Sequence, residues 1–380
     1  MKNRIILIIL TLLTLLFMTG CGISNTIYLE INSRGLVSAE SGAHFRGSTL
    51  DIPEKINGTY VTGIAQNGFR YASGMSGMRV TLPEGVKTIG SNAFYGTGAV
   101  FPDLDLTKVE SVAYDAFNDC AITRLTINSN ITKYTPCWLR GTTEVKELVL
   151  EEGTEVLYSI IDTDRRKTLR LVSLPSTLTT VMADALSLCS SLEAIELPSS
   201  VTTIGDNAFK DTGVEIETLD LRNITSLGMT AFSGCTIGKL YVNDNITDYS
   251  STWSEGIEGL NKLVVGKGMT KLTDFLSDGM RSTLKYVLIQ EGVTEIDSSV
   301  FQNCTSLESV TLPSTLSKIG SYAFSGTNMV FDELDLTSVT YVGENAFDGC
   351  SVKSLKTGNT SSYATGWKKG LTVLKAEELD

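Results

Sequence analysis

The chain has 380 residues, of which 42% are hydrophobic, and it carries a net charge of −12 at neutral pH. This hydrophobic content excludes wholesale disorder, and 34 Gly against only 7 Pro suits a chain with many short turns. The acidic balance disfavours nucleic acid and anionic membrane surfaces as partners, because both repel a negatively charged protein. Length alone suggests two or three globular domains, an expectation that fails if the chain is one array of repeats.

The first twenty residues have the layout of an export signal. Lys2 and Arg4 precede an apolar run over residues 5–17, and no acidic residue occurs before Glu30. The run matches the apolar core of a signal peptide and is shorter than the ~20 residues that span a bilayer. The sequence therefore predicts a signal peptide over residues 1–20.

The residues that follow the apolar run add a second feature. Residues 17–21 read FMTGC and resemble the lipobox of bacterial lipoproteins, although Met18 replaces the usual aliphatic residue. The resemblance implies that Cys21 becomes the lipidated N-terminus of the mature protein at the cell envelope. Plain secretion, an uncleaved anchor and a chance cysteine are the competing interpretations. Residues 21–45 are expected to form a tether and an N-terminal cap.

Beyond residue 45 the chain repeats itself. TIGSNAF at 88–94 returns as TIGDNAF at 203–209 and as KIGSYAF at 318–324, each time 115 residues later. Inside each block a shorter apolar–x–Leu pattern recurs every 21–24 residues, with its last apolar residue at Leu82, Leu106, Ile127, Leu150, Leu174, Leu197, Leu221, Val242, Val265, Ile289 and Leu312. This spacing predicts about fourteen coils over residues 46–357 and excludes repeats of helical pairs.

Each coil has the same expected local structure. A segment such as VTLP alternates apolar and polar residues and predicts a short strand, which Pro83 ends because proline cannot extend a ladder. Ile89 points inward, Gly90 allows a sharp turn, and residues 92–94 (NAF) form a helical turn that buries Ala and Phe. No coil can bury these residues alone, so the coils stack. Residues 358–380 are expected to add a closing strand at 371–374 and an acidic tail.

These repeats resemble a known family. The segments at 197–213 and 293–324 are similar to the BspA-type leucine-rich repeats of bacterial surface proteins, and the similarity extends over residues 46–357. The resemblance implies an α/β repeat solenoid, a right-handed superhelix with a ladder of short parallel strands, and a surface-exposed, non-enzymatic binding or adhesive role. Coils near 137–165 and 252–280 depart from the pattern, and IIDTDRR at 160–166 has no evident counterpart.

The chemistry-bearing residues predict no catalytic, metal or cofactor site. His44 is the only histidine and precedes the repeats, so no Ser-His-Asp or Cys-His pair is expected, and no C-x-x-C spacing occurs. Asp105, Asp220 and Asp335 lie five coils, or roughly 24 Å, apart at ordinary strand spacing and cannot share a substrate. Asp162 and Asp164 are close together but have no other catalytic group beside them.

The cysteines follow the coils. Five of them occupy the third position after the Ala-Phe pair or its equivalent: Cys120, Cys189, Cys235, Cys304 and Cys350. Because they lie two or three coils apart, they are expected to be buried free thiols. Cys137 is out of phase, which leaves a Cys120–Cys137 disulfide open.

The remaining candidates are surface residues. The outward strand positions are Thr81, Asp105, Thr126, Val149, Ser173, Glu196, Asp220, Tyr241, Val264, Leu288, Thr311 and Asp335. Interface hot spots favour Tyr and Trp, so Tyr241 is a candidate together with Glu196 and Asp220. Trp138 and Trp253 hold matching places in two blocks and are candidates if exposed, although repeated apolar positions usually face inward.

These observations predict a lipid-anchored, surface-exposed bacterial protein that binds another macromolecule without catalysis. The expected partner is a protein or glycan on a host, a neighbouring cell or the envelope. The alternatives are a structural envelope protein without a specific ligand and a hydrolase that depends on carboxylates.

Overall fold

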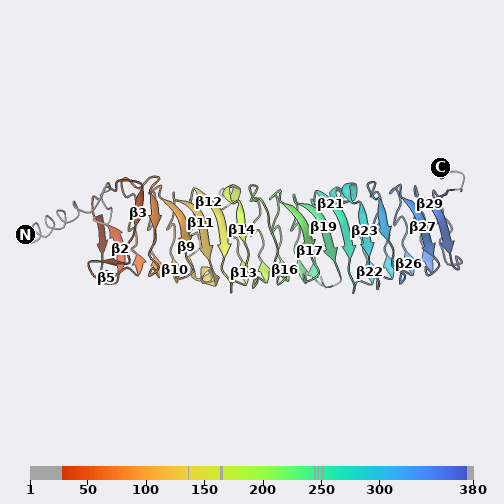
Figure 1. Cartoon of the computed structure of the whole chain (residues 1–380), viewed down its shortest axis with the longest axis horizontal. Coiled ribbons are helices and arrows are strands. Elements are labelled where there is room, and N and C mark those ends of the chain that lie inside the picture. The colour runs from red at the N-terminus through yellow and green to blue at the C-terminus, as the bar shows by residue number, and fades with distance from the viewer. Residues whose placement is uncertain are drawn as a thin grey trace, which may run out of the picture.

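The computed structural model describes residues 28–135, 137–162, 166–243, 245, 248–249 and 252–374. The predicted signal peptide, Cys21 and residues 375–380 lie outside these ranges. The described chain is a long stack of coils, with its N-terminal end at one end and its C-terminal end at the other (Figure 1). The coils follow one another in chain order, so each lies beside its sequence neighbours, as the 21–24-residue spacing predicts.

One side of the stack is a ladder of the longer parallel strands, here called the long ladder. Its register places Leu125 beside Leu104 and Leu148, so the leucines of the apolar–x–Leu pattern align from coil to coil. The ladder consists of three parallel sheets: β3 (Thr49–Asp51), β7 (Arg79–Thr81), β9 (Val100–Asp105), β11 (Ala121–Ile127), β12 (Glu144–Leu150) and β14 (Leu171–Ser173); β17 (Glu215–Asp220), β19 (Thr236–Val242), β21 (Gly259–Val265), β23 (Tyr286–Ile289) and β25 (Ser309–Thr311); β27 (Val330–Leu336), β29 (Ser351–Thr357) and β30 (Thr372–Val373).

A second side is a ladder of two-residue strands, the short ladder. It contains β6 (Gly63–Ile64), β8 (Thr88–Ile89), β10 (Ser111–Val112), β13 (Val156–Leu157), β15 (Thr180–Val181), β16 (Thr203–Ile204), β18 (Ser226–Leu227), β20 (Asp248–Tyr249), β22 (Lys271–Leu272), β24 (Glu295–Ile296), β26 (Lys318–Ile319) and β28 (Tyr341–Val342). It consists of three sheets, with breaks between β10 and β13 and between β20 and β22, and within each sheet these strands pair in parallel, as Ile204 does with Val181 and Leu227. At the N-terminal end β1 (Leu29–Ile31) pairs antiparallel with β2 (Leu36–Ala39), which continues the ladder, and β4 (Lys55–Ile56) forms a hairpin with β5 (Thr59–Tyr60).

On the third side of the stack, the expected helical turns at the NAF segments are absent from the described chain. The NAF segments form tight turns, and helix in the described chain is limited to α2 (Asp278–Thr283) and the 3-10 segments η2 (Ser129–Lys133) and η3 (Arg166–Thr168). The Phe209 amide donates to the Ala231 carbonyl of the next coil at 2.8 Å, whereas the Ala208 amide donates within its own coil to Gly205 at 3.3 Å. Amides that alternate between two coils cannot build a helix. The architecture is a parallel-strand solenoid with little helix.

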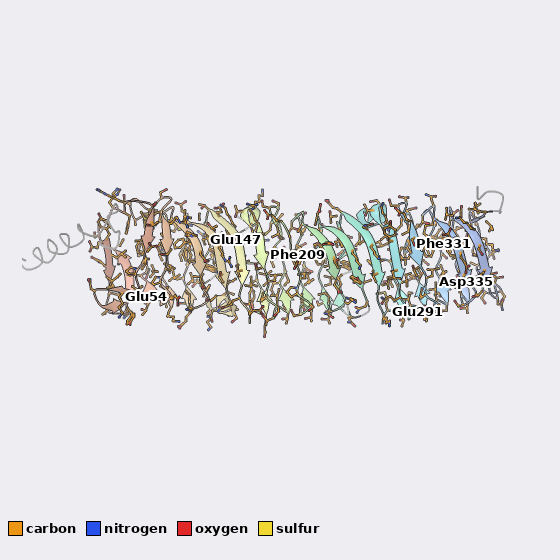
Figure 2. All side chains as sticks on the ribbon, viewed as in Figure 1. Glu54, Glu147, Phe209, Glu291, Phe331 and Asp335 are labelled. Carbon is orange, nitrogen blue, oxygen red and sulfur yellow. The ribbon has the colours of Figure 1, made fainter. Side chains whose placement is uncertain are left out.

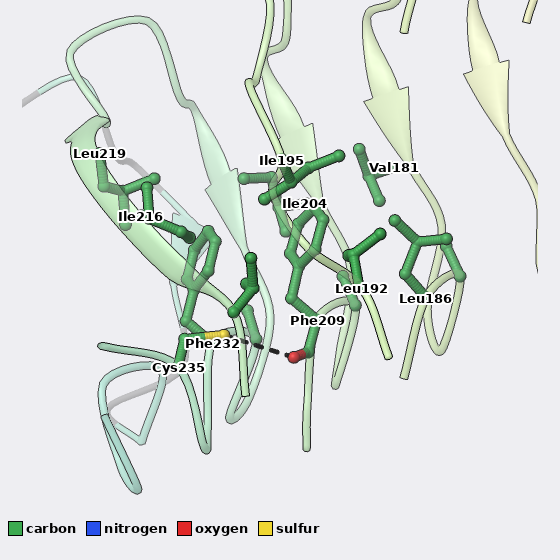
Figure 3. Close-up of a cluster of buried hydrophobic side chains, with 14 of the residues drawn as sticks. Val181, Leu186, Leu192, Ile195, Ile204, Phe209, Ile216, Leu219, Phe232 and Cys235 are labelled. Carbon is green, nitrogen blue, oxygen red and sulfur yellow. Dashed lines mark hydrogen bonds between the residues drawn. The ribbon is translucent and has the colours of Figure 1, made fainter. Parts of the chain in front are cut away.

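The core runs along the inside of the stack. Phe209 and Phe232 are buried and stack with centroids 5.2 Å apart and planes 5° apart, and Ile204 and Leu192 pack around them (Figure 3). Burying one such side chain stabilises the fold by about 1.5–3 kcal/mol. Because the Phe209 ring packs on the Phe232 ring of the next coil, the core depends on the stacking that the 115-residue echo predicts.

The glycine after the inward Ile has a specific structural role. A Cβ on Gly205 would lie 2.5 Å from the Ala183 backbone nitrogen of the preceding coil, and one on Gly320 would lie 2.4 Å from that of Ser298. Neither glycine has a positive φ, so the close approach of two backbones explains the residue here better than the conformational freedom that the sequence suggested.

The described cysteines are all free: Cys120, Cys137, Cys189, Cys235, Cys304 and Cys350. This confirms the free thiols expected in the repeat positions and excludes the Cys120–Cys137 bond. Cys120 and Cys235 are buried and contact the hydroxyls of Thr97 and Thr212 at 3.4 and 3.3 Å. Burial raises the pKa of the Cys120 thiol to about 12 and that of Cys235 to about 11.

This burial leads to an expected pattern of thiol reactivity. In the full chain with Cys21→Ala, Ellman's reagent at pH 8 should react rapidly with Cys137 alone, which is exposed. The five buried thiols should react only after denaturation, because they are inaccessible and thiolate formation at pH 8 is disfavoured by their raised pKa. Rapid reaction of two or more thiols in the native protein, or fewer than six after denaturation, would contradict the stacked core.

Candidate binding surface

The outward row of the long ladder is continuous from Asp220 to Leu288, but Glu196 lies in the break between β14 and β17, where its coil forms no strand. Asp220 lies in register with Tyr241, Tyr241 with Val264, and Val264 with Leu288. Asp220 is exposed, and Tyr241 and Leu288 are half-buried. Val264 is only 3% exposed because the larger side chains of Tyr241 and Leu288 flank it, so it is removed from the predicted surface row.

Tyr241 and Asp220 belong to one contact network. The Arg222 guanidinium lies 4.6 Å from the Tyr241 ring centroid, and the Lys239 ammonium lies 4.4 Å from it. Arg222 also donates from Nε and Nη2 to the two carboxylate oxygens of Asp220 at 2.9 and 2.5 Å. The hydrogen bond from Arg222 lowers the pKa of Asp220. The sequence predicted Tyr241 and Asp220 but missed the two cations that hold the ring in place.

Glu196 lies one coil before Asp220. It is exposed, and its neighbours Ile195 and Leu197 line a small pocket of about 200 Å³ together with Asp220. The three predicted residues therefore form one patch over three consecutive coils, here called the Tyr241 patch: Glu196, Asp220, Arg222, Lys239 and Tyr241.

A groove that the sequence did not reveal adjoins this patch. It has a volume of about 390 Å³ and lies where Gly238 and Gly259 leave the strands without side chains. Tyr286 forms one wall, is 40% exposed, and donates from its hydroxyl to Glu308 Oε2 at 2.6 Å. One block earlier the same places hold Thr123, Glu144 and Leu171, so only the middle block has the open floor and the aromatic wall.

The tryptophans do not belong to the surface. Trp138 and Trp253 are 5% and 3% exposed, so they cannot be hot spots for a macromolecule on the outer surface and are removed from the candidate residues for that role. The Trp138 ring packs edge-on against Tyr134 with centroids 5.4 Å apart. The Tyr134 hydroxyl donates to the backbone carbonyls of Leu106 and Val109 in the preceding coil, so the two rings are part of the packing between coils.

The polar residues weighed for catalysis have structural contacts. His44 Nδ1 lies 2.8 Å from Ser73 Oγ at an exposed position, where the two residues form a parallel β-bridge. Asp105 and Asp335 accept from the amides of Thr107 and Thr337 at 2.8 and 2.9 Å and so cap turns. Outward carboxylates such as Glu147 and Asp335 lie at distant levels of the stack (Figure 2).

The described residues offer neither a metal site nor a membrane-spanning helix. They contain no group of three or more His, Cys, Asp or Glu side chains that could hold a metal ion. None of their helices has the length and apolar character needed to cross a membrane.

Comparison with known proteins identifies the family. The model of the BspA type leucine rich repeat region matches six copies, over residues 62–161, 165–276 and 280–365. The chain belongs to this family. No curated protein matches it significantly. The breaks between the matched ranges, at residues 162–164 and 277–279, fall within the two coils that were expected to depart from the pattern.

Solved structures of other leucine-rich repeat proteins are similar to this one. A leucine-rich repeat protein from Bacteroides ovatus is 20% identical, with 91% of this chain and 90% of that one covered, at a TM-score of 0.49. A leucine rich cell surface protein from Faecalibacterium prausnitzii is 17% identical over 92% and 96%, at 0.36. The pneumococcal vaccine antigen PcpA is 15% identical over 90% and 94%, at 0.29.

Proposed function

We propose that this BspA-type protein is a lipid-anchored bacterial surface protein that binds another macromolecule through the long ladder of its middle block. The observation that supports the proposal most is the Tyr241 patch: an aromatic ring with two cations over it and Asp220 in register beside it, with the exposed Glu196 one coil farther along. Aromatic and arginine side chains on an accessible face are typical of interface hot spots.

Comparison of the three 115-residue blocks distinguishes residues needed for packing from residues of the surface. The buried position of Phe209 holds Phe94 and Phe324 in the other blocks, unchanged. The position of Tyr241 holds Thr126 and Lys356 instead. Since the fold tolerates three different residues there, Tyr241 is not required for stacking and is available for binding.

The chemistry of the patch suits a protein or glycan partner on a host, a neighbouring cell or the envelope. An aromatic face packs against apolar side chains or sugar rings, while Arg222, Asp220 and Glu196 provide donors and acceptors. The ladder of about fourteen coils is roughly 65 Å long at ordinary strand spacing, enough for a standard interface of ~800 Å² per side.

The test combines capture with matched variants. The full chain in detergent is used to capture and identify an envelope, host-surface or glycan partner, and the dissociation constant is then measured. The triple variant Glu196→Gln, Asp220→Asn, Tyr241→Ala should weaken binding at least tenfold without a change in circular dichroism, since one hot spot alone exceeds ~1.4 kcal/mol. Changes at Thr81, Asp105 and Thr126, their counterparts one block earlier, should leave affinity unchanged.

Three outcomes would redirect the proposal. Full affinity in the triple variant would place binding on another side, a cap or the tail. A chain that captures no specific partner would support a structural envelope role. Turnover of a glycan, lost on changing one carboxylate, would support the hydrolase.

A further inference from the structure

Two arginines, one buried and one half-buried, occupy equivalent places in the first two blocks. Arg166 and Arg281 are 115 residues apart, and each lies between its own coil and the next. Arg166 donates to the Ser187 carbonyl at 2.8 Å, and Arg281 donates to the Gln302 carbonyl at 2.8 Å. This corrects the expectation that residues 160–166 have no counterpart, because residues 275–281 repeat their contacts.

The two arginines differ in one partner. Arg281 Nη2 donates to the carboxylate of Asp274 at 2.5 Å. Arg166 Nη2 donates at 2.6 Å to the hydroxyl of Ser159, which stands 115 residues before Asp274. The middle block thus has a carboxylate where the first block has a neutral group.

The missing carboxylate leaves a buried charge. Arg166 is only 7% exposed, and a guanidinium stays protonated in proteins. Its remaining described partners are the Ile161 carbonyl and Ser187, and no ion pair among the described residues includes it. A buried cation is stable only with charge or dipoles around it, so a carboxylate beside Ser159 would be favourable.

A pocket opens beside this arginine. It has a volume of about 600 Å³ and is lined by Arg166 and Ser159, by the rings of Tyr134, Trp138 and Tyr158, and by Arg140. Asp162 also lines it and accepts from the Gly141 amide at 3.3 Å. The equivalent pocket beside Asp274 and Arg281 measures only about 270 Å³.

We propose that this pocket binds a small organic carboxylate. The carboxylate takes the place beside Arg166 that Asp274 takes beside Arg281, and the aromatic rings contact the body of the ligand. The volume lies within the ~300–1,000 Å³ of small-molecule sites. The pocket belongs to the irregular coil of the first block, and this proposal does not depend on the Tyr241 patch.

The first test needs no variant of the site. The melting temperature of the full chain with Cys21→Ala is measured against rising concentrations of glucuronate and of benzoate, with glucose and benzamide as neutral counterparts. A ligand that binds only the folded state raises the melting temperature with concentration. At least one carboxylate should give a saturable rise that its neutral counterpart does not give. A rise with glucuronate alone indicates an acidic sugar, and a rise with benzoate alone indicates an aromatic acid.

The internal copy provides the second test. Ser159→Asp restores the carboxylate of the middle block, so it should raise the melting temperature without ligand and weaken carboxylate binding at least tenfold. Ser159→Asn has the same size without the charge and should not raise the melting temperature. The reciprocal change Asp274→Ser should lower the melting temperature and add a carboxylate-dependent rise, which keeps the idea testable if Ser159→Asp does not fold.

Three results would overturn the proposal. One is the absence of any carboxylate-specific rise in the parent chain. A second is equal carboxylate binding by Ser159→Asp and its parent. A third is a rise that appears only with Asp164→Asn, because Asp164, which lies outside the described residues, would then be the counter-ion of Arg166.

Discussion

Phe324→Ala is expected to lower the free energy of unfolding of the third block by about 3–5 kcal/mol. The Phe324 side chain is fully buried and stacks between Phe301 and Phe347, with centroids 5.3 and 5.4 Å away. Its removal leaves a cavity that both neighbouring coils border, and the hydrogen bonds between the coils limit how far they can collapse into it.

Urea denaturation combined with hydrogen exchange measures this effect. Each coil contacts only its neighbours, so protection should fall mainly in the coils around residues 301–347. Tyr322→Ala is the matched control: it lies in the same turn, is 38% exposed, and should cost less than about 1 kcal/mol. A loss for Phe324→Ala no greater than that of the control would contradict the continuous core.

The regular part of this fold could be predicted because the fold repeats. The constant 115-residue spacing of Ile89, Ile204 and Ile319 predicted their burial, and each is at most 1% exposed. The place of Cys120, third after the Ala-Phe pair, predicted a buried thiol, and its side chain contacts Thr97, which follows Phe94 by the same three residues one coil earlier. Such predictions need only the period, since every coil has the same neighbours.

The turns on the third side could not be predicted in the same way. The NAF segment has acceptable helix formers, and nothing in one coil shows that its Phe amide bonds to the next coil. Asn207, with φ of 55°, marks the turn, because Asn tolerates the left-handed region better than most residues. That Asn is the local signal that was available in the sequence.

For the candidate sites too, the repeat period predicted some features and could not predict others. Register predicted that Asp220 and Tyr241 are neighbours, but the position of Arg222 over the ring depends on a side-chain direction that spacing does not specify. Arg166 was missed for another reason. The positions that hold Phe275 and Ser277 in the middle block hold Ile160 and Asp162 in the first block, so the two segments share little sequence similarity. The 115-residue distance between Arg166 and Arg281 was the one signal in the sequence that could have shown the two arginines to be equivalent.

Cys21→Ala is expected to abolish lipid modification altogether, which is the largest change expected for any single residue of this chain. The charged start, the apolar run over residues 5–17 and the FMTGC segment motivate the expectation. Stable anchoring requires more than one acyl chain, because one chain alone binds a membrane only marginally. The wild-type protein should therefore sediment with membranes, incorporate labelled fatty acid and have the mass of a lipidated chain that begins at Cys21.

The mass of the Cys21→Ala protein decides the outcome, because an uncleaved precursor would also sediment with membranes. The variant should have either the full precursor mass or the mass of a chain cleaved without lipid, and it should incorporate no label. Cys137→Ala is the matched control, since it removes an exposed cysteine from the repeats and should leave lipid and location unchanged. An unaltered mass and retained label in Cys21→Ala would show that this cysteine is not the lipid attachment site. The anchor would then have to be sought elsewhere, while the stack of coils, which begins its described part at residue 28, would be unaffected.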